Sequence, residues 1–306
     1  MGMQDSPEMP IIRAERHRLR SWLATNIPIQ WSKHVASIQH NEKGVTATFK
    51  DGTSARGDIL VGADGINSVV REQLLQRPGS DLLKLVPLAA IVGEVDLSGE
   101  AFKRQLELGH SAYIFFGPDM SFWNFGGVHH VHPDGVSGRH YWMYMQPDPT
   151  VEDEDHWLRK ATQQEKLDFV LGRVAEAHPK FQEIFKLTPV ENIKKGVHIW
   201  RDLELNELPA GRVVLMGDAA HAMTPFRGEG GYHTLIDAMK LSRILGELDV
   251  KSNVAVEAAV SQYNAEMLTR GSEAVRNSRS VHSAKQTVNF MAKPLPKAEI
   301  VLEAMA

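Results

Sequence analysis

Apolar and polar positions alternate differently near the ends of the chain and in its middle. Residues 59–62 and 212–216 are short, mainly apolar runs, and each predicts a strand buried on both faces of a parallel sheet. A helix is expected from about Ser68 after the first run. The second run predicts a glycine-rich loop over residues 217–231 and a helix over residues 232–248. The segments near the two ends of the chain therefore have α/β character.

The middle of the chain is richer in aromatic and β-branched residues. Four such runs are joined by turns that contain Gly and Pro, and they predict an antiparallel sheet: residues 89–97, 112–116, 122–128 and 140–145. A charged segment with helical spacing follows over residues 151–178. The order of α/β, antiparallel and α/β segments predicts two domains that share the chain discontinuously.

Helical and strand patterns complete the two α/β parts. A basic amphipathic helix is predicted over residues 11–24. Runs typical of strands cover residues 31–40 and 44–50, just before an Asp-Gly turn signal. Residues 254–283 have the mixed charge of a helix with a solvated face.

Composition narrows the class of protein. The 306 residues are 42% hydrophobic and 24% charged, with a net charge of -4, so nothing favours nucleic acid or a membrane as partner. Cysteine is absent, which excludes disulfides, thiolate nucleophiles and Cys-based metal sites. No signal peptide and no run of about 20 apolar residues is present, so we expect a soluble, cytoplasmic protein with no metal.

Three sequence motifs occur in a specific order. They are RHRLRSWL at 16–23, DILVGADG at 58–65 and GRVVLMGDAAHAMTPFRGEGG at 211–231. Together they resemble the R-x-x-L-R-x-x-L helix, the DG motif and the GD motif of class A flavoprotein monooxygenases, which are similar to para-hydroxybenzoate hydroxylase. The resemblance extends over essentially the whole chain and is closest to fungal secondary-metabolite members.

This resemblance implies an α/β fold with mixed α+β character. Residues 1–85 and 190–306 would form part of an FAD/NAD(P)-binding-type domain with a parallel sheet, and residues 86–189 an antiparallel-sheet substrate domain. It also implies an oxidoreductase that uses FAD and NAD(P)H on an apolar, aromatic or polycyclic small molecule. About half of the aromatic residues in the middle strands should face inward, and some should line the substrate pocket.

The GD motif has a physical interpretation of its own. A buried strand ends in Gly217, which lets the backbone approach a ligand closely, and Asp218 follows at the carboxyl edge of the sheet, where open α/β folds bind ligands. By resemblance, the Asp218 carboxylate accepts hydrogen bonds from the flavin ribityl chain. The next helix would direct its positive end at the flavin ring. Asp237 on that helix would help hold the loop.

The resemblance assigns further residues to the cofactor. Asp64 and Gly65 would lie near the pyrophosphate, Arg71 would neutralise phosphate charge, and Arg16 would approach the same region. The flavin-ring side of the site would also contain residues of the GD loop: Pro225, Gly228, Gly230 and Gly231. Arg227 and Glu229 lie in this loop too, and they could instead pair with each other at the surface. His221 could be a hydrogen-bonded structural residue.

Two departures from the family pattern favour an alternative function. No G-x-G-x-x-G turn precedes Arg16, so the chain resembles an N-terminally truncated member, and we expect autonomous FAD binding to be weak or lost. Tyr232 and His233 stand where the family usually has a small residue and Asn, and Tyr232 could project into the volume of the flavin ring.

The alternative is a flavin-independent isomerase, cyclase or hydrolase that reuses the pocket for acid/base chemistry, for example to open an epoxide with rearrangement. Its candidate acids and bases are six residues near the flavin site: Asp218, His221, Arg227, Glu229, Tyr232 and His233. A third possibility is a non-catalytic subunit or remnant that binds ligands without turnover.

An exposed sheet edge is also expected. In the family the strand that ends at Val61 has a neighbour from the segment with the G-x-G-x-x-G turn. Proteins cover apolar strand edges. We therefore expect a second copy of the chain, or a separate polypeptide, to cover this one.

Overall fold

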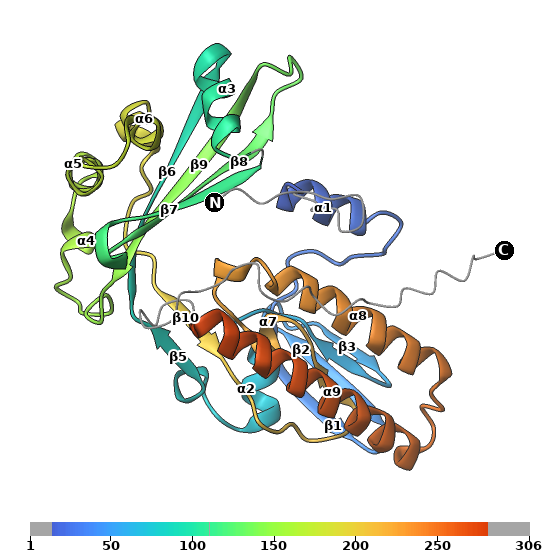
Figure 1. Ribbon diagram of the computed structural model, residues 1–306. Coiled ribbons are helices and arrows are strands. Elements are labelled where there is room, and N and C mark those ends of the chain that lie inside the picture. Colours follow the sequence, from blue (N-terminus) through green and yellow to red (C-terminus); the bar gives the residue numbers. More distant parts are fainter. Residues whose placement is uncertain (1–13, 110, 281–306) are drawn as a thin grey trace.

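The middle of the chain forms a four-stranded antiparallel sheet in the computed structural model, which describes residues 14–109 and 111–280 (Figure 1). The strand order is β6-β9-β8-β7. All four strands coincide with the predicted runs, and most extend beyond them by one to a few residues: β6 (Leu88–Ser98), β7 (Ala112–Phe116), β8 (Trp123–Val131) and β9 (Ser137–Pro147).

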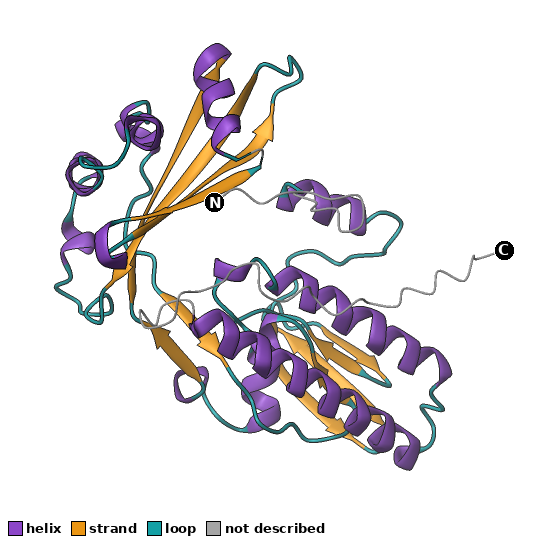
Figure 2. Ribbon diagram, viewed as in Figure 1, coloured by secondary structure: helices purple, strands orange, loops and turns teal. Residues whose placement is uncertain are grey.

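Three helices cover one face of this sheet. Alternate residues of the strands pack against three helices in one hydrophobic cluster that includes Trp142, which is completely buried, and Phe185: the helices are α3 (Gly99–Leu108), α5 (Gln163–Arg173) and α6 (Pro179–Lys186). Figure 2 shows these helices on the same side of the orange strands. The opposite face is available to other parts of the molecule.

The segment at 151–178 is helical only in part. It contains α4 (Trp157–Lys160) and then α5, and the chain is extended at Ala161 between them. The break has a local cause, because Thr162 and Glu165 form a capping box that starts a new helix.

A parallel pair of short strands carries the DG and GD motifs. β4 (Leu60–Gly62) pairs with β11 (Val213–Leu215), with Gly62 opposite Leu215. β11 is wholly buried, as predicted, but the prediction of burial on both faces is wrong for β4, because Val61 is 37% exposed. Within the described residues, β4 has β11 as its only strand neighbour.

The remaining strands form two antiparallel groups. β1 (Val35–Asn41), β2 (Gly44–Phe49) and β3 (Ser54–Gly57) make a three-stranded meander, and β5 (Leu83–Val86) pairs with β10 (Trp200–Leu203). Val45 on β2 packs into a second hydrophobic cluster with the buried strand β11.

Helices surround the parallel pair. α2 (Val69–Leu75) begins at the Ser68 N-cap, as predicted. The prediction of a glycine-rich loop over residues 217–231 is wrong in part, since the segment contains the short helix α7 (Asp218–His221) and a 3-10 turn, Pro225–Arg227. The long helices α8 (Gly230–Glu247) and α9 (Asn253–Ser280) follow, and residues 281–283 of the predicted last helix lie outside the described residues.

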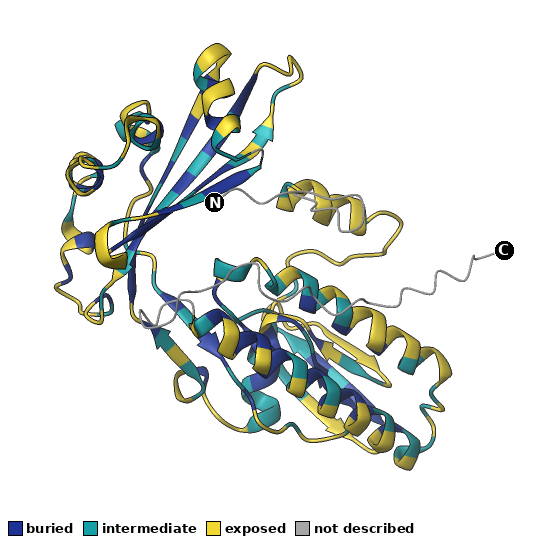
Figure 3. Cartoon of the chain, viewed as in Figure 1, coloured by how far each residue is buried: buried dark blue, intermediate teal, exposed yellow. Residues whose placement is uncertain are grey.

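Helix α1 (Arg16–Leu23) is shorter than the predicted range 11–24, of which residues 11–13 lie outside the described residues. It has no buried residue, and both Leu19 and Leu23 are at least 40% exposed. The predicted apolar stripe therefore does not pack into a core (Figure 3).

The buried hydrophobic side chains form three clusters within the described residues, and one of them joins the antiparallel sheet to Val86, Trp200 and Phe226. One cluster joins the antiparallel sheet to its helices, and another joins β2, β4 and β11 to α2, α8 and α9. Ile193, Val197 and Ile199 pack with the cluster of the sheet and its helices. The proposed domain boundaries at residues 85/86 and 189/190 stay a prediction.

Candidate functional site

The carboxyl ends of β4 and β11 lie side by side, and the candidate site begins there. Gly217 follows β11 with a φ of +59°, a conformation that favours glycine. Asp218 is the first residue of α7 and is exposed. Within the described residues its carboxylate has no hydrogen-bonding partner, so it is available to a ligand at the sheet edge.

The DG motif forms the neighbouring turn. The Asp64 carboxylate accepts hydrogen bonds from Ser68 Oγ (2.5 Å) and from the backbone N–H of Val70 (3.2 Å), which fixes the start of α2. Gly65 has a φ of +81°, and a Cβ atom there would meet no atom within 4 Å. The backbone of this turn thus borders open space.

Arg71 is completely buried behind this turn. Its guanidinium donates to the backbone carbonyls of Ile66 (2.7 Å) and Ala219 (3.2 Å), and burial lowers its pKa. Arg71 therefore joins α2 to α7. The contact with a phosphate that the resemblance implies stays a prediction.

The GD loop turns back on itself through a charged pair. Pro225 starts a 3-10 turn that ends at Gly228, whose φ is +68°. Arg227 donates two hydrogen bonds to the Glu229 carboxylate, of 2.9 and 2.8 Å, and this contact raises the pKa of Arg227. The two side chains pair with each other, which was one of the two predicted arrangements.

The N-terminus of α8 follows directly and is open. No side chain within the described residues caps it. A Cβ atom at Gly231 would meet nothing within 4 Å, and one at Gly230 would only touch Met223 at 3.8 Å. The unpaired N–H groups and the positive end of the helix dipole are therefore accessible to an anionic group.

The two histidines predicted as acids or bases lie behind the loop. His221 is 2% exposed and its Nε2 lies 2.7 Å from Asp237 Oδ2. His233 is 7% exposed and accepts a hydrogen bond at Nδ1 from Arg270 (3.0 Å). Tyr232 is half-buried, and its ring meets the His233 ring edge-on at 5.3 Å. Both imidazoles are thus committed to internal contacts.

The open face of the antiparallel sheet supplies apolar surface. Half-buried side chains on this face include Val92, Phe125, Tyr141 and Met143. By contrast Tyr113, Phe115, Phe122, Trp142 and Tyr144 belong to the buried cluster on the other face, as alternation predicts.

Phe226 connects the GD loop to this face. Its ring contacts Trp123 of β8 at 6.1 Å and Trp200 of β10 at 5.0 Å, both edge-on. Sequence analysis did not identify Phe226, although a large apolar residue inside a polar, glycine-rich loop was a usable signal. The contact brings the loop and the open sheet face to one location.

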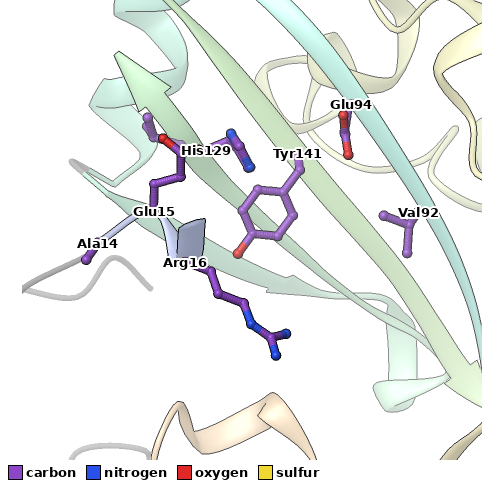
Figure 4. A pocket seen from close by; sticks show the side chains of 8 residues that line it. Ala14, Glu15, Arg16, Val92, Glu94, His129 and Tyr141 are labelled. Atoms are coloured by element: carbon purple, nitrogen blue, oxygen red, sulfur yellow. The ribbon is translucent and has the colours of Figure 1, made fainter. Parts of the chain in front are cut away.

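A pocket of about 270 Å³ lies on the same sheet face, between β6, β8, β9 and the start of α1 (Figure 4). Figure 4 shows the hydroxyl end of Tyr141 directed toward the Arg16 side of the pocket. Arg16 is exposed, so its side chain is accessible to a ligand. The pocket residues are Ala14, Glu15, Arg16, Val92, Glu94, Val128, His129 and Tyr141.

Residues 14–109 and 111–280 contain neither a candidate metal site nor a candidate membrane-spanning helix. No group of three or more His, Asp or Glu side chains there could hold a metal ion. No helix in the same ranges is both long and apolar enough to cross a membrane.

Comparison with known proteins assigns the family. Residues 13–278 match the FAD binding domain family. The FAD-dependent monooxygenase thnD of Trichoderma harzianum is 56% identical over 316 aligned positions, which cover 100% of this chain and 78% of that protein. The chain belongs to the FAD-dependent monooxygenase family. Members of this family are oxidoreductases.

Other members of the FAD-dependent monooxygenase family match less closely. The monooxygenase cctM of Talaromyces islandicus is 30% identical, with 89% of this chain and 68% of that protein covered. The crystal structure of Klebsiella pneumoniae HpxO with FAD and uric acid superposes with a TM-score of 0.65 at 24% identity, covering 87% of this chain and 60% of that one. This likeness to HpxO supports the fold alone.

The residues of this monooxygenase-family chain fit the flavin-ring side of FAD. Asp218 is an open acceptor, Gly228 and Gly231 border open space, and α8 presents an uncapped N-terminus. A carboxylate can accept hydrogen bonds from the ribityl hydroxyls of FAD. The positive end of a helix favours negative charge on the flavin ring. The described residues contain no G-x-G-x-x-G turn for the diphosphate.

Proposed function

We propose that this chain binds FAD at the GD loop and takes part in the oxygenation of an apolar, aromatic or polycyclic small molecule of secondary metabolism, with NAD(P)H as electron donor. One observation supports it most. The exposed, unpartnered carboxylate of Asp218 follows Gly217, which lies against Thr234 near the open N-terminus of α8, and Phe226 links the GD loop to the aromatic sheet face.

The chain's own groups have distinct tasks in this proposal. Bound FAD would supply the redox chemistry, accepting electrons from the nicotinamide and reacting with oxygen. Asp218 would accept hydrogen bonds from the ribityl hydroxyls, and the N-terminus of α8 would favour negative charge on the flavin ring. Both groups are fixed by secondary structure, so they need little reorganisation when charge develops.

The open sheet face would hold the substrate. Phe125, Met143 and Val92 supply apolar contact, while Tyr141 and His129 can form hydrogen bonds at the edge of the pocket. Such a surface favours a flat, mainly apolar molecule that carries hydroxyl or carbonyl groups. Apolar walls would also exclude water from the reaction.

Flavin titration tests the proposal directly. We expect the purified full-length chain to quench added FAD fluorescence saturably and to acquire a flavin absorption band. We also expect NAD(P)H oxidation that depends on an aromatic substrate and oxygen. A chain that binds no FAD would overturn the proposal. Turnover of an epoxide or a related substrate without flavin would then favour the isomerase, cyclase or hydrolase alternative.

A further inference from the structure

A buried charged network lies directly behind the GD loop, and Arg270 of α9 is its centre. The guanidinium donates from Nη2 to Asp237 Oδ1 (2.6 Å), from Nη1 to His233 Nδ1 (3.0 Å) and from Nε to Glu266 Oε1 (3.0 Å). Asp237 and His233 are both on α8. One side chain of α9 therefore holds the first two turns of α8.

Asp237 extends the network to α7. The residue is completely buried, and its Oδ2 accepts hydrogen bonds from the backbone N–H of Gly217 (2.8 Å) and from Nε2 of His221 (2.7 Å). Burial raises the pKa of Asp237, but hydrogen bonds from His221 and Arg270 outweigh it, so the pKa is lowered and the group is a carboxylate. Arg270 supplies the full positive charge that such a buried anion requires.

The same contacts determine which nitrogen of His233 carries hydrogen. A guanidinium has donors and no acceptor, so Nδ1 of His233 must be the acceptor. The neutral ring therefore carries its hydrogen on Nε2. Burial lowers the pKa of His233, with Arg270 and His221 acting in the same direction, and this keeps the ring neutral.

We propose that Arg270 is a positioning residue for the flavin-facing loop. It acts through Asp237 on the Gly217 turn that presents Asp218, and it holds His233 as the Nε2–H tautomer in the first turn of α8. The consequence for flavin rests on the proposed function, whereas the tautomer and the loop geometry do not.

Close packing makes the arrangement rigid. The ring of His221 lies against Gly271 of α9, where a Cβ atom would come within 2.7 Å of the ring. α7 and α9 are thus in contact next to Arg270. A lysine at 270 would keep the charge, but a single ammonium cannot copy a planar fork that reaches three acceptors in fixed directions.

The first experiment uses the flavin-free full-length chain. Imidazole nitrogen NMR should show His233 as the Nε2–H tautomer in the wild type. This signature should be lost in Arg270→Met, which has no donor, and in Arg270→Gln, whose amide oxygen is an acceptor. The control is Arg276→Gln, because Arg276 lies on the same helix but pairs with Glu204 at the surface. Retention of the tautomer in both Arg270 variants would overturn the proposal.

The second experiment compares flavin affinity with folding. Arg270→Lys should keep a cooperative thermal transition and weaken FAD binding about tenfold or more, the ratio expected for one lost hydrogen bond. Arg276→Gln should bind as the wild type does. Equal affinity in Arg270→Lys and wild type would refute the positioning role. Absence of FAD binding in the wild type would refute the proposed function, while the NMR result would still decide the role of Arg270.

Discussion

Two aspartates of the same site show how environment assigns a role. Asp237 is completely buried and its oxygens accept hydrogen bonds from Gly217, His221 and Arg270, so nothing is left for a ligand. Asp218 is exposed and has no partner within the described residues. Sequence alone placed Asp218 correctly after a buried strand, but it could not separate these two environments.

Asp218→Asn tests the role of the open carboxylate. An amide offers one acceptor oxygen in place of two and no charge, so FAD affinity should fall about 10- to 100-fold, the loss of one or two charge-assisted hydrogen bonds. The thermal midpoint should hardly change because the side chain is exposed. Asp168→Asn, at an exposed position on α5, is the matched control. Fluorescence titration measures the difference, and equal affinities would contradict the assignment.

His233 predicts a pH dependence of stability. Burial above all, and then its neighbours Arg270 and His221, lower its pKa below the usual 6.5, although Glu229 and Asp237 oppose this. Just below pH 6.5 the unfolded chain binds a proton that the folded chain does not, so the free energy of unfolding falls as the solution is acidified. The contribution of the neutral His233 ring to the free energy of unfolding is fully present above pH 6.5.

Denaturant unfolding at about pH 7 and about pH 5 measures this effect. His233→Gln should lose part of the difference between the two pH values, while His17→Gln, on the exposed helix α1, should keep all of it. The same difference in all three proteins would show that His233 does not contribute.

Arg71 shows why some site residues could not be predicted. The phosphate contact that the resemblance implies for Arg71 stays a prediction, but its observed contact with Ala219, which is 148 residues away in the chain, could not be predicted. Arg270 meets His233 across 37 residues. Periodicity and spacing describe neighbours within an element, so they carry no information about such distant pairs.

At the scale of elements, burial of alternate side chains in a core explains which predictions held. β7 occupies the predicted range 112–116, because its alternate residues enter the buried cluster. The secondary structure of the GD loop was harder to predict, since the four residues of α7 are too few to show a helical period. The prediction of a strand buried on both faces was wrong at Val61, because an apolar sequence pattern does not show whether a neighbouring strand is present.

A pair of glycines tests how the helix-covered sheet is packed. A Cβ atom at Gly93 of β6 would clash with the indole of Trp142, so Gly93→Ala should cost about 1–3 kcal/mol in the free energy of unfolding. Gly172 of α5 has open space beside it, and Gly172→Ala should stabilise by roughly 0.5–1 kcal/mol. Denaturant unfolding of the two variants should give opposite signs. A neutral Gly93→Ala would contradict the observed packing of Trp142.

At the scale of the whole molecule, β4 remains open along one edge within the described residues, and Val61 on it is 37% exposed. Association with a second copy of the chain stays a prediction. Sedimentation at micromolar concentration should show a species heavier than 34.1 kDa. Val61→Lys should shift it toward monomer, since an edge lysine disfavours strand addition. A wild type that is monomeric throughout would refute self-association.

The two faces of the antiparallel sheet are packed differently, and this has an evolutionary consequence. Helices cover one face, whereas a smaller cluster that includes Trp123 and Trp200 covers part of the other. The side chains that hold the sheet to its helices, such as Trp142 and Tyr144 of β9, alternate along the strand with Tyr141, which lines the pocket. Replacing Val92, Phe125 or Met143 would therefore alter which molecules are accepted while leaving the helix-covered layer untouched. A sheet of this kind can diversify its chemistry through mutation without forfeiting its foldability.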